Sequence, residues 1–221
     1  MLIFGGRHTN DLIRLAKRDC CACPPLLPPR GMLNDRTTPL SLLETRRSGR
    51  PRDLFEPGPD ANELTRILAV AMRTPDHGKL APWRFVHVAR DRRGAFSDLL
   101  FAAYRAEQGE PSEATAEAIT RLAFQAPELV VVLFSPKESA KIPLWEQQLS
   151  CGAAVMNLQH AAHAIGYVSG WVTGWPAYSD HVRAAFGTQE ERIAGFVYIG
   201  TPGAPLEERA RPAFDEVASR W

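Results

Sequence analysis

The chain has 221 residues, enough for a sizeable hydrophobic core, and this length fits one domain better than two. Its formal net charge of +1 gives no global attraction to nucleic acid or to an anionic membrane. No apolar run approaches the length needed to span a bilayer. These totals argue against a nucleic-acid module and a helical membrane protein, so we expect neither partner.

The first part of the chain, residues 1–38, differs in composition from the rest. It holds four closely spaced prolines between Pro24 and Pro29, which prevent a regular helix. We expect a poorly ordered tail over 1–38 and a single folded domain over 39–221. An alternative is that translation starts at Met32.

Four cysteines occur, and three of them crowd into Cys20–Cys23. This is a poor disulfide framework for a chain of this size, so a reducing cytoplasm is the expected compartment. The cluster could supply thiolate ligands, but no second pair follows at zinc spacing. We therefore expect no metal site.

The first predicted helices are short and carry recognisable start signals. Ser41 can cap a helix that runs into an arginine-rich stretch. Asp60 and Glu63 form a capping-box-like pair, and the helix after them ends before Pro75. Its buried face is set by apolar residues at i, i+3, i+4 and i+7: Leu64, Ile67, Leu68 and Ala71.

A polar loop over 74–83 leads into a strand-like run at 85–88. A loop of this kind, fixed at both ends by regular elements, is a common place for binding groups, and His77 is its conspicuous residue. A solvent-exposed histidine without a binding role is the alternative.

The remaining elements alternate in type along the chain. Helices are expected from Asp91 through Tyr104, over 112–124, over 144–165, and from Ser179 or Asp180 to Phe186. Strands are expected over 129–134, 167–173 and 193–199. The continuous apolar run at 129–134 predicts a central strand buried on both faces. This mixture indicates an α+β fold, with α/β as the alternative.

The long helix carries small side chains over 150–154, which would let another helix approach closely. They fit a helix-on-helix dimer seam and a crowded monomer core equally well. The last segment, 205–221, has the pattern of an extended arm laid on a neighbour.

Three arginines and a serine stand within five residues, from Arg46 to Arg50. Guanidinium groups fork onto phosphate or carboxylate oxygens, a serine hydroxyl adds a donor, and Gly49 lets backbone approach closely. The stretch therefore predicts an anion cradle. A solvated helix end is the alternative.

From about Leu40 to the C-terminus, the chain resembles the FMN-dependent nitroreductase family, in particular its short, minimal members. The resemblance rests on blocks in a shared order: Arg46-Arg47-Ser48, Ala71–His77, Pro82-Trp83, Pro143–Gln147, Ala153–Gln159, Trp171–Gly174 and Gly195–Pro202. It implies an α+β fold with a central, mainly antiparallel sheet flanked by helices. It also implies an intertwined homodimer with two FMN sites at the interface.

The resemblance also implies roles for individual residues. Arg46, Arg47 and Ser48 would hold the phosphate and ribityl end of FMN, with Arg50 as an additional contact. Arg73 and His77 would reach the same flavin from the other subunit. The ring would be lined by Trp171, Val172 and Thr173. The nicotinamide nucleotide would meet the segment Ala161, Ala162, His163, Ala164, Ile165 and Gly166.

Three positions depart from the family pattern. Pro51-Arg52-Asp53 makes the arginine stretch about two residues longer than in the minimal relatives. Ala81 stands where many members carry glutamine, and Val172 stands where close relatives have arginine. Arg209 and Arg211 resemble a basic pair near the phosphate in larger members.

The implied activity is hydride transfer from NAD(P)H, through flavin N5, to a small-molecule acceptor such as a nitroaromatic or a quinone, in a ping-pong mechanism. The cofactor carries the redox chemistry, so no protein nucleophile is expected. The alternative is a flavin-binding protein without turnover, for storage, sensing or as a scaffold.

Overall fold

The structure is a computed structural model, and it describes residues 32–221. The expectations for the tail before residue 32 and for the cysteine cluster lie outside the described residues. Residues 32–38 already contact the domain. Asn34 Oδ1 accepts a hydrogen bond from Arg47 N at 2.7 Å, and Asn34 Nδ2 donates to Arg47 O at 3.0 Å.

Most regular elements of this part of the chain follow the order expected from the sequence. A short strand at Leu54–Phe55 and a helical turn at Phe214–Val217 were not expected, and the helical turn interrupts the extended arm expected over 205–221. The helices are α1 (Pro39–Thr45), α2 (Ala61–Ala71), α3 (Arg93–Gln108), α4 (Glu113–Phe124), α5 (Leu144–Ala164), α6 (Asp180–Phe186) and α7 (Phe214–Val217). The strands are β1 (Leu54–Phe55), β2 (Trp83–His87), β3 (Glu128–Phe134), β4 (Val168–Val172) and β5 (Arg192–Pro202).

The strands form one sheet in the order β1-β5-β3-β2, and β4 pairs with β5. All of these pairings are antiparallel. The long strand β5 is the centre, because β3 pairs along one side of it while β4 and then β1 pair along the other. The expected antiparallel α+β architecture is confirmed.

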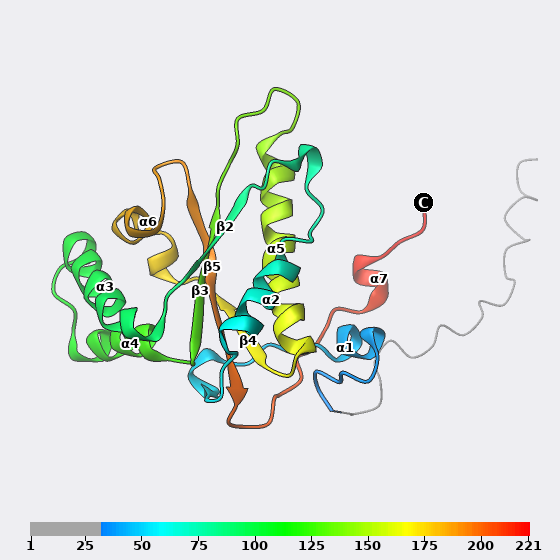
Figure 1. The fold of residues 1–221 in the computed structure, drawn as a ribbon, viewed down its shortest axis with the longest axis horizontal. Helices are drawn as coiled ribbons and strands as arrows, with labels where there is room; N and C mark the ends of the chain where they lie inside the picture. Colours follow the sequence, from blue (N-terminus) through cyan, green and yellow to red (C-terminus); the bar gives the residue numbers. More distant parts are fainter. Residues whose placement is uncertain (1–31) are drawn as a thin grey trace, which may run out of the picture. The chain divides into compact units, whose positions relative to one another are not determined.

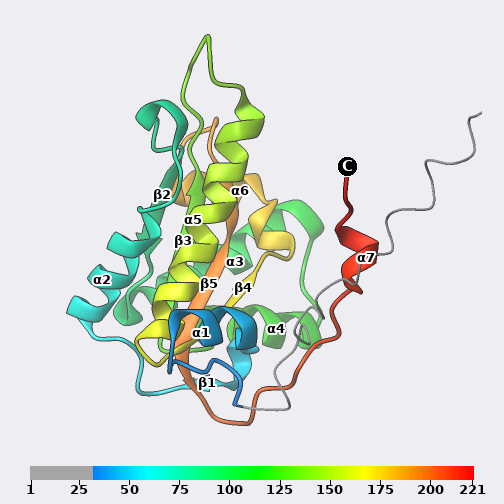
Figure 2. The same ribbon diagram turned by 90° about the vertical axis from the view of Figure 1, so that its right-hand side faces the viewer.

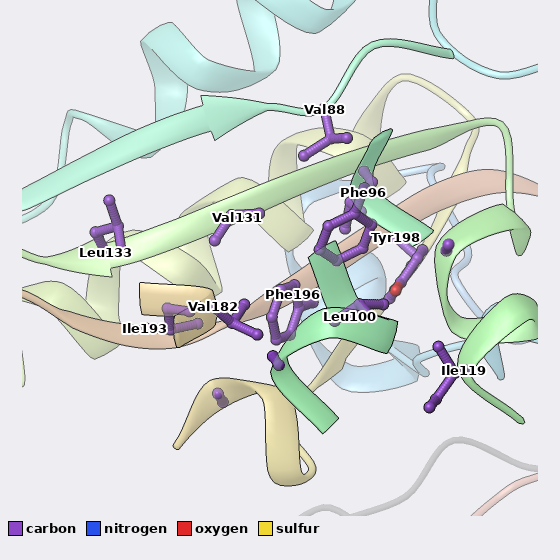
Figure 3. Packing of buried hydrophobic residues seen from close by; sticks show 14 of the residues in the cluster. Val88, Phe96, Leu100, Ile119, Val131, Leu133, Val182, Ile193, Phe196 and Tyr198 are labelled. Atoms are coloured by element: carbon purple, nitrogen blue, oxygen red, sulfur yellow. The ribbon is translucent and has the colours of Figure 1, made fainter. Parts of the chain in front are cut away.

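Helices cover both faces of the sheet. In Figure 1, α3, α4 and α6 lie on one side of the strands, and α2 and α5 lie on the other. The buried side chains of β3 alternate between the two cores, with Leu129, Val131 and Leu133 in one and Val130, Val132 and Phe134 in the other. Figure 3 shows part of the first core, where Val131 lies near Phe196 and Leu133 lies toward Ile193. A strand covered on both faces needs apolar residues at every position, which explains the continuous run in the sequence.

Helix starts were predicted with mixed success. Asp60 and Glu63 do form a capping box on α2. The cap expected at Ser41 is wrong, because Thr38 caps α1 and Ser41 completes the capping box from the third helical position. The start expected at Asp91 is also wrong: a 3-10 turn over Arg90–Arg92 precedes α3.

The small residues of α5 are divided between two environments. Cys151 and Ala154 are buried against the sheet. Gly152 is different, since an added Cβ there meets no atom of the described chain within 4 Å. The outer side of α5 also exposes Trp145 and Leu149. Figure 2 shows this long helix lying across the sheet, with α1 crossing below its C-terminal end.

The C-terminal segment leaves the sheet after β5. In Figures 1 and 2, α7 lies apart from the sheet and its helices. Its apolar side chains Phe214 and Val217, and the terminal Trp221, are exposed. Among the described helices, none is long and apolar enough to cross a bilayer.

Candidate functional site

The arginine stretch lies along the outer edge of β4. Gly49 N donates to Ser169 O at 3.1 Å, so the stretch continues the sheet by one hydrogen bond. A Cβ added at Gly170 would come within 2.6 Å of Gly49 O, and one added at Gly49 would come within 2.8 Å of Val168 Cγ1. Glycine at these two positions therefore allows the close approach that places the arginines.

Positive charge converges at this edge. Arg46 is half-buried, and the pKa of its guanidinium is lowered by burial, then by the charges of Arg211 and Arg47, while Glu208 opposes the shift. Cations held close together and away from water favour a bound anion. Arg46 Nη1 donates to Ser48 Oγ at 3.0 Å, which aims the guanidinium along the segment.

The other two arginines of the stretch are held by the C-terminal segment. Arg47 Nε donates to Glu207 O at 2.6 Å, and Arg50 Nη2 lies 3.0 Å from Glu207 Oε2. Both side chains of the Arg50–Glu207 pair are more than half exposed, so the pair contributes little to stability. Arg46 and Arg47, which are partly buried, are therefore the inner cations, and the exposed Arg50 is an outer one. Arg211 is exposed and lies 3.6 Å from Glu208, and its charge acts on Arg46.

Behind the arginines lies a buried polar group on α5 and β4. Ser48 Oγ donates to Gln159 Oε1 at 3.4 Å, and Gln159 is 3 % exposed. His163 is fully buried, and its Nε2 accepts from Ser169 N at 3.0 Å. Burial, with the nearby charges of Arg46 and His160, lowers the pKa of His163 to about 3, so its imidazole is neutral.

An aromatic surface adjoins the arginine stretch on β4. Trp171 is 40 % exposed, and its Nε1 donates to Ala194 O at 3.0 Å. A Cβ added at Gly195 would lie 2.0 Å from that nitrogen, so this glycine lets the indole lie against β5. Val172 instead packs against the core under α3 and α6, on the opposite face of the sheet from Trp171.

Two of the predicted residues lie elsewhere in the chain. His77 Nδ1 is 2.7 Å from Glu146 Oε2, at the N-terminal end of α5. Arg73 is exposed just after α2. At 1.5 Å per residue, the stretch of α5 from Glu146 to His163 is about 25 Å long. One chain therefore does not bring His77 to the arginine stretch.

Comparison with known proteins gives this arrangement a family. The profile of the nitroreductase family matches residues 43–201. The chain belongs to the nitroreductase family.

Individual relatives agree with this assignment. The chain is 40 % identical over 168 residues to the Escherichia coli (strain K12) protein named "Putative NAD(P)H nitroreductase YdjA", covering 74 % of this chain and 87 % of that one. A nitroreductase-like protein from Bacillus cereus superposes with a TM-score of 0.70 at 21 % identity, covering 84 % and 96 % of the two chains. The FMN and NADPH-dependent nitroreductase NfnB from Sphigopyxis sp. strain HMH superposes with a TM-score of 0.64 at 20 % identity, covering 83 % of this chain and 99 % of that one.

In this nitroreductase-family chain, the segment 161–166 borders a cavity of about 430 Å³ between α1, α2 and α5. Ala161, Ala164 and Ile165 line the cavity. Ala162 and His163 have no exposed surface and do not line it. Gly166 follows the helix with a φ of +112°, next to the guanidinium of Arg36.

Several residues of the site were assigned no role from the sequence. Gln159 belongs to a family block, but its contact with Ser48 depends on how α5 packs against the edge of β4. Ser169 contacts the arginine stretch from a distant part of the sequence, and Asn34 contacts it from 13 residues before Arg47. Arg211 resembles one member of a basic pair in larger relatives, and the structure places its charge beside Arg46.

Proposed function

We propose that this chain is an FMN-dependent oxidoreductase that uses NAD(P)H as co-substrate. The observation that carries the proposal is the pair of partly buried guanidinium groups of Arg46 and Arg47, with the charge of Arg211 beside Arg46, along a strand that exposes Trp171. Such a group suits a dianion, and a phosphate monoester carries nearly two negative charges at neutral pH. The donor set therefore fits the phosphate of FMN, and Trp171 offers a flat apolar surface nearby.

When bound, FMN would supply the redox chemistry, taking hydride at N5 from NAD(P)H and passing it to a nitroaromatic, a quinone or a similar acceptor in a ping-pong sequence. The residues of the chain would bind and orient. Arg46 and Arg47 would hold the phosphate, with Arg50 as an outer contact, and Ser48 would donate to the phosphate or ribityl oxygens. Trp171 of β4 and Thr173, which directly follows the strand, would flank the ring, while Val172 would act through its backbone.

The proposed enzyme is a homodimer. The His77 end and the Arg46 end of the expected site are separated by most of the length of α5. A two-fold axis near the middle of this helix, close to Gly152, would bring His77 and Arg73 of one subunit to the arginine stretch of the other. The exposed apolar residues on α5 and on the C-terminal arm support such an interface, because large exposed patches mark association sites.

The cavity beside 161–166 is the proposed place for part of the nicotinamide nucleotide. Arg36 and Arg66 line it and could meet phosphate groups, while Leu42, Leu43 and Ile165 give it an apolar wall. The charge of Arg46 acts on His160, another lining residue, so the cavity adjoins the cradle.

Anaerobic titration tests the proposal. Protein loaded with FMN is mixed with NADH or NADPH, and the flavin absorbance is followed before a quinone or nitroaromatic is added. The proposal expects bleaching on addition of the nucleotide and recovery on addition of the acceptor. Bound flavin that stays oxidised with both nucleotides would instead support the alternative of a flavin-binding protein without turnover.

A further inference from the structure

The strand β4 has a free edge that is covered in an unusual way. The backbone groups of an edge strand that point away from the sheet need partners outside the ladder. At Ser169 both find one: its N–H donates to His163 Nε2 at 3.0 Å, and its C=O accepts from Gly49 N at 3.1 Å. A helix side chain on one group and the arginine stretch on the other thus take the place of a further strand.

The histidine is suited to this task as an acceptor. Because Nε2 receives the N–H of Ser169, the neutral imidazole must carry its proton on Nδ1. Nδ1 is buried and has no hydrogen-bond partner among residues 32–221. A buried donor without a partner lowers stability, and an apolar side chain would avoid that loss. The feature of His163 that an apolar residue could not supply is its acceptor nitrogen.

From Ser169 a short series of polar contacts reaches the cradle. Ser169 Oγ lies 3.0 Å from His163 Nε2 and 3.5 Å from Gln159 Oε1. Gln159 Oε1 also accepts from Ser48 Oγ at 3.4 Å, and Ser48 Oγ in turn accepts from Arg46 Nη1 at 3.0 Å. The His163 end of this series is buried, and the Arg46 end faces the anion site.

We propose that His163 is a positioning residue of the anion cradle, which fixes Ser169 and thereby sets Gly49, Ser48 and Arg46 for phosphate binding. The identity of the anion as the phosphate of FMN rests on the proposed function. The positioning itself concerns the flavin-free chain. It gives His163 a role other than direct contact with a nicotinamide nucleotide, in keeping with its full burial.

Two substitutions of His163 distinguish the loss of its hydrogen-bond acceptor from the loss of its side-chain volume. His163→Leu fills the space without an acceptor, whereas His163→Gln can place an amide oxygen near the position of Nε2. Cys151→Ala is the matched control, because Cys151 is also buried on α5 and its sulfur contacts Leu133 O, away from the cradle. The measurements are the Kd values of FMN and of riboflavin by fluorescence titration, and hydrogen exchange of the Gly49 amide in the flavin-free protein.

His163→Leu is expected to raise the Kd of FMN about tenfold, which is about 1.4 kcal/mol, and to change the Kd of riboflavin less than about twofold. The Gly49 amide should exchange about tenfold faster, since its acceptor Ser169 is no longer held. His163→Gln should bring both the Kd of FMN and the Gly49 exchange rate most of the way back to the wild-type values. Cys151→Ala should change neither quantity.

Each contrary result has its own meaning. An unchanged Gly49 exchange rate in His163→Leu overturns the positioning role, whatever the flavin does. An equal loss of FMN and riboflavin, without rescue by His163→Gln, also overturns it, because general damage to α5 then explains the loss. A wild-type protein that binds no FMN refutes the proposed function, while the exchange measurement still decides the role of His163.

Discussion

At the scale of single residues, the site is governed by positive charges that lack full compensation. Arg46 is half-buried next to Arg47 and Arg211, and burial with like charge lowers its pKa. This arrangement is unfavourable in the absence of an anion, and a bound phosphate would remove the repulsion. Ligand binding and stability should therefore be linked, so that FMN raises the melting temperature of the protein.

The inner and outer arginines should differ in their effect on flavin retention. We expect Arg46→Ala to raise the Kd of FMN roughly 10- to 100-fold, because a hydrogen bond between charged groups contributes about 1.5–3 kcal/mol. Arg50→Ala should change it only a few-fold, since Arg50 is exposed and paired with Glu207. Fluorescence titration of both variants decides this, and equal Kd values for Arg46→Ala and wild type would remove Arg46 from the site.

The buried carboxylate of Glu191 should make the stability of the protein depend on pH in acid. Glu191 is 4 % exposed and accepts from Arg84 at 2.7 and 3.0 Å, and Arg84 lowers the pKa of this carboxyl to about 2. Because the folded pKa lies below the unfolded value, the stabilisation is complete at pH 7 and is lost as the pH falls from about 5 through 2.

Glu191→Gln should accordingly lower the free energy of unfolding by about 2–3 kcal/mol at pH 7, and the gap to wild type should narrow by more than half near pH 3. Urea unfolding of both proteins between pH 7 and pH 3 measures this difference in the free energy of unfolding. A gap that is the same at both pH values would mean that the charge of Glu191 is not responsible.

At the scale of elements, local patterns in the sequence carried most of the prediction. The capping box at Asp60 and the apolar spacing after it depend on residues within one helix, so α2 could be read directly. The continuous apolar run of β3 also predicts its strand directly, because helices cover both faces of the strand. Helix starts at Ser41 and Asp91 were misplaced, since several nearby residues were able to cap and a short 3-10 turn has no distinct pattern.

The parts of the site that escaped prediction depend on contacts between distant segments. Arg47 meets Glu207, which is 160 residues away along the chain. The contact of Ser48 with Gln159 spans 111 residues. His163 and Ser169 are close in sequence, but the hydrogen bond between them depends on the turn that brings β4 back along α5. Residue spacing alone does not encode such contacts.

The packing of the arginine stretch against β4 gives an element-scale prediction. Gly170→Ala should push the stretch away, since the new Cβ would lie 2.6 Å from Gly49 O. We expect a loss of about 1–3 kcal/mol in the free energy of unfolding together with weaker FMN binding. Gly94→Ala on α3 is the control, because its Cβ meets no atom of the described chain within 4 Å. Wild-type FMN affinity in Gly170→Ala would contradict the close packing.

At the scale of the whole molecule, the residues expected to form one flavin site lie in two separate places on a single chain. The cradle contacts Gln159 near the C-terminal end of α5, and His77 is paired with Glu146 at the N-terminal end. The outer face of α5 exposes Trp145 and Leu149, which an isolated soluble domain would bury more fully. An antiparallel pair of α5 helices would account for both features.

A substitution at Gly152 distinguishes a close pair of α5 helices in a dimer from a solvent-exposed α5. In an isolated chain, Gly152→Ala should stabilise α5 by about 0.8–1 kcal/mol, because the added methyl group has room and alanine favours helix. Across a close helix pair the same methyl group should weaken the dimer instead. Light scattering over a range of protein concentrations measures the dimer fraction of Gly152→Ala and of wild type. A variant that is more stable and no less dimeric would place the seam elsewhere.

Light scattering combined with flavin absorbance on one chromatographic peak asks whether two chains together hold FMN between them. We expect a particle with twice the mass of one chain that carries one FMN per chain, as an obligate interface of roughly 2,000–5,000 Å² or more would give. A protein that stays colourless after incubation with FMN, or a monomer that carries FMN, would show that the flavin is not held between two chains.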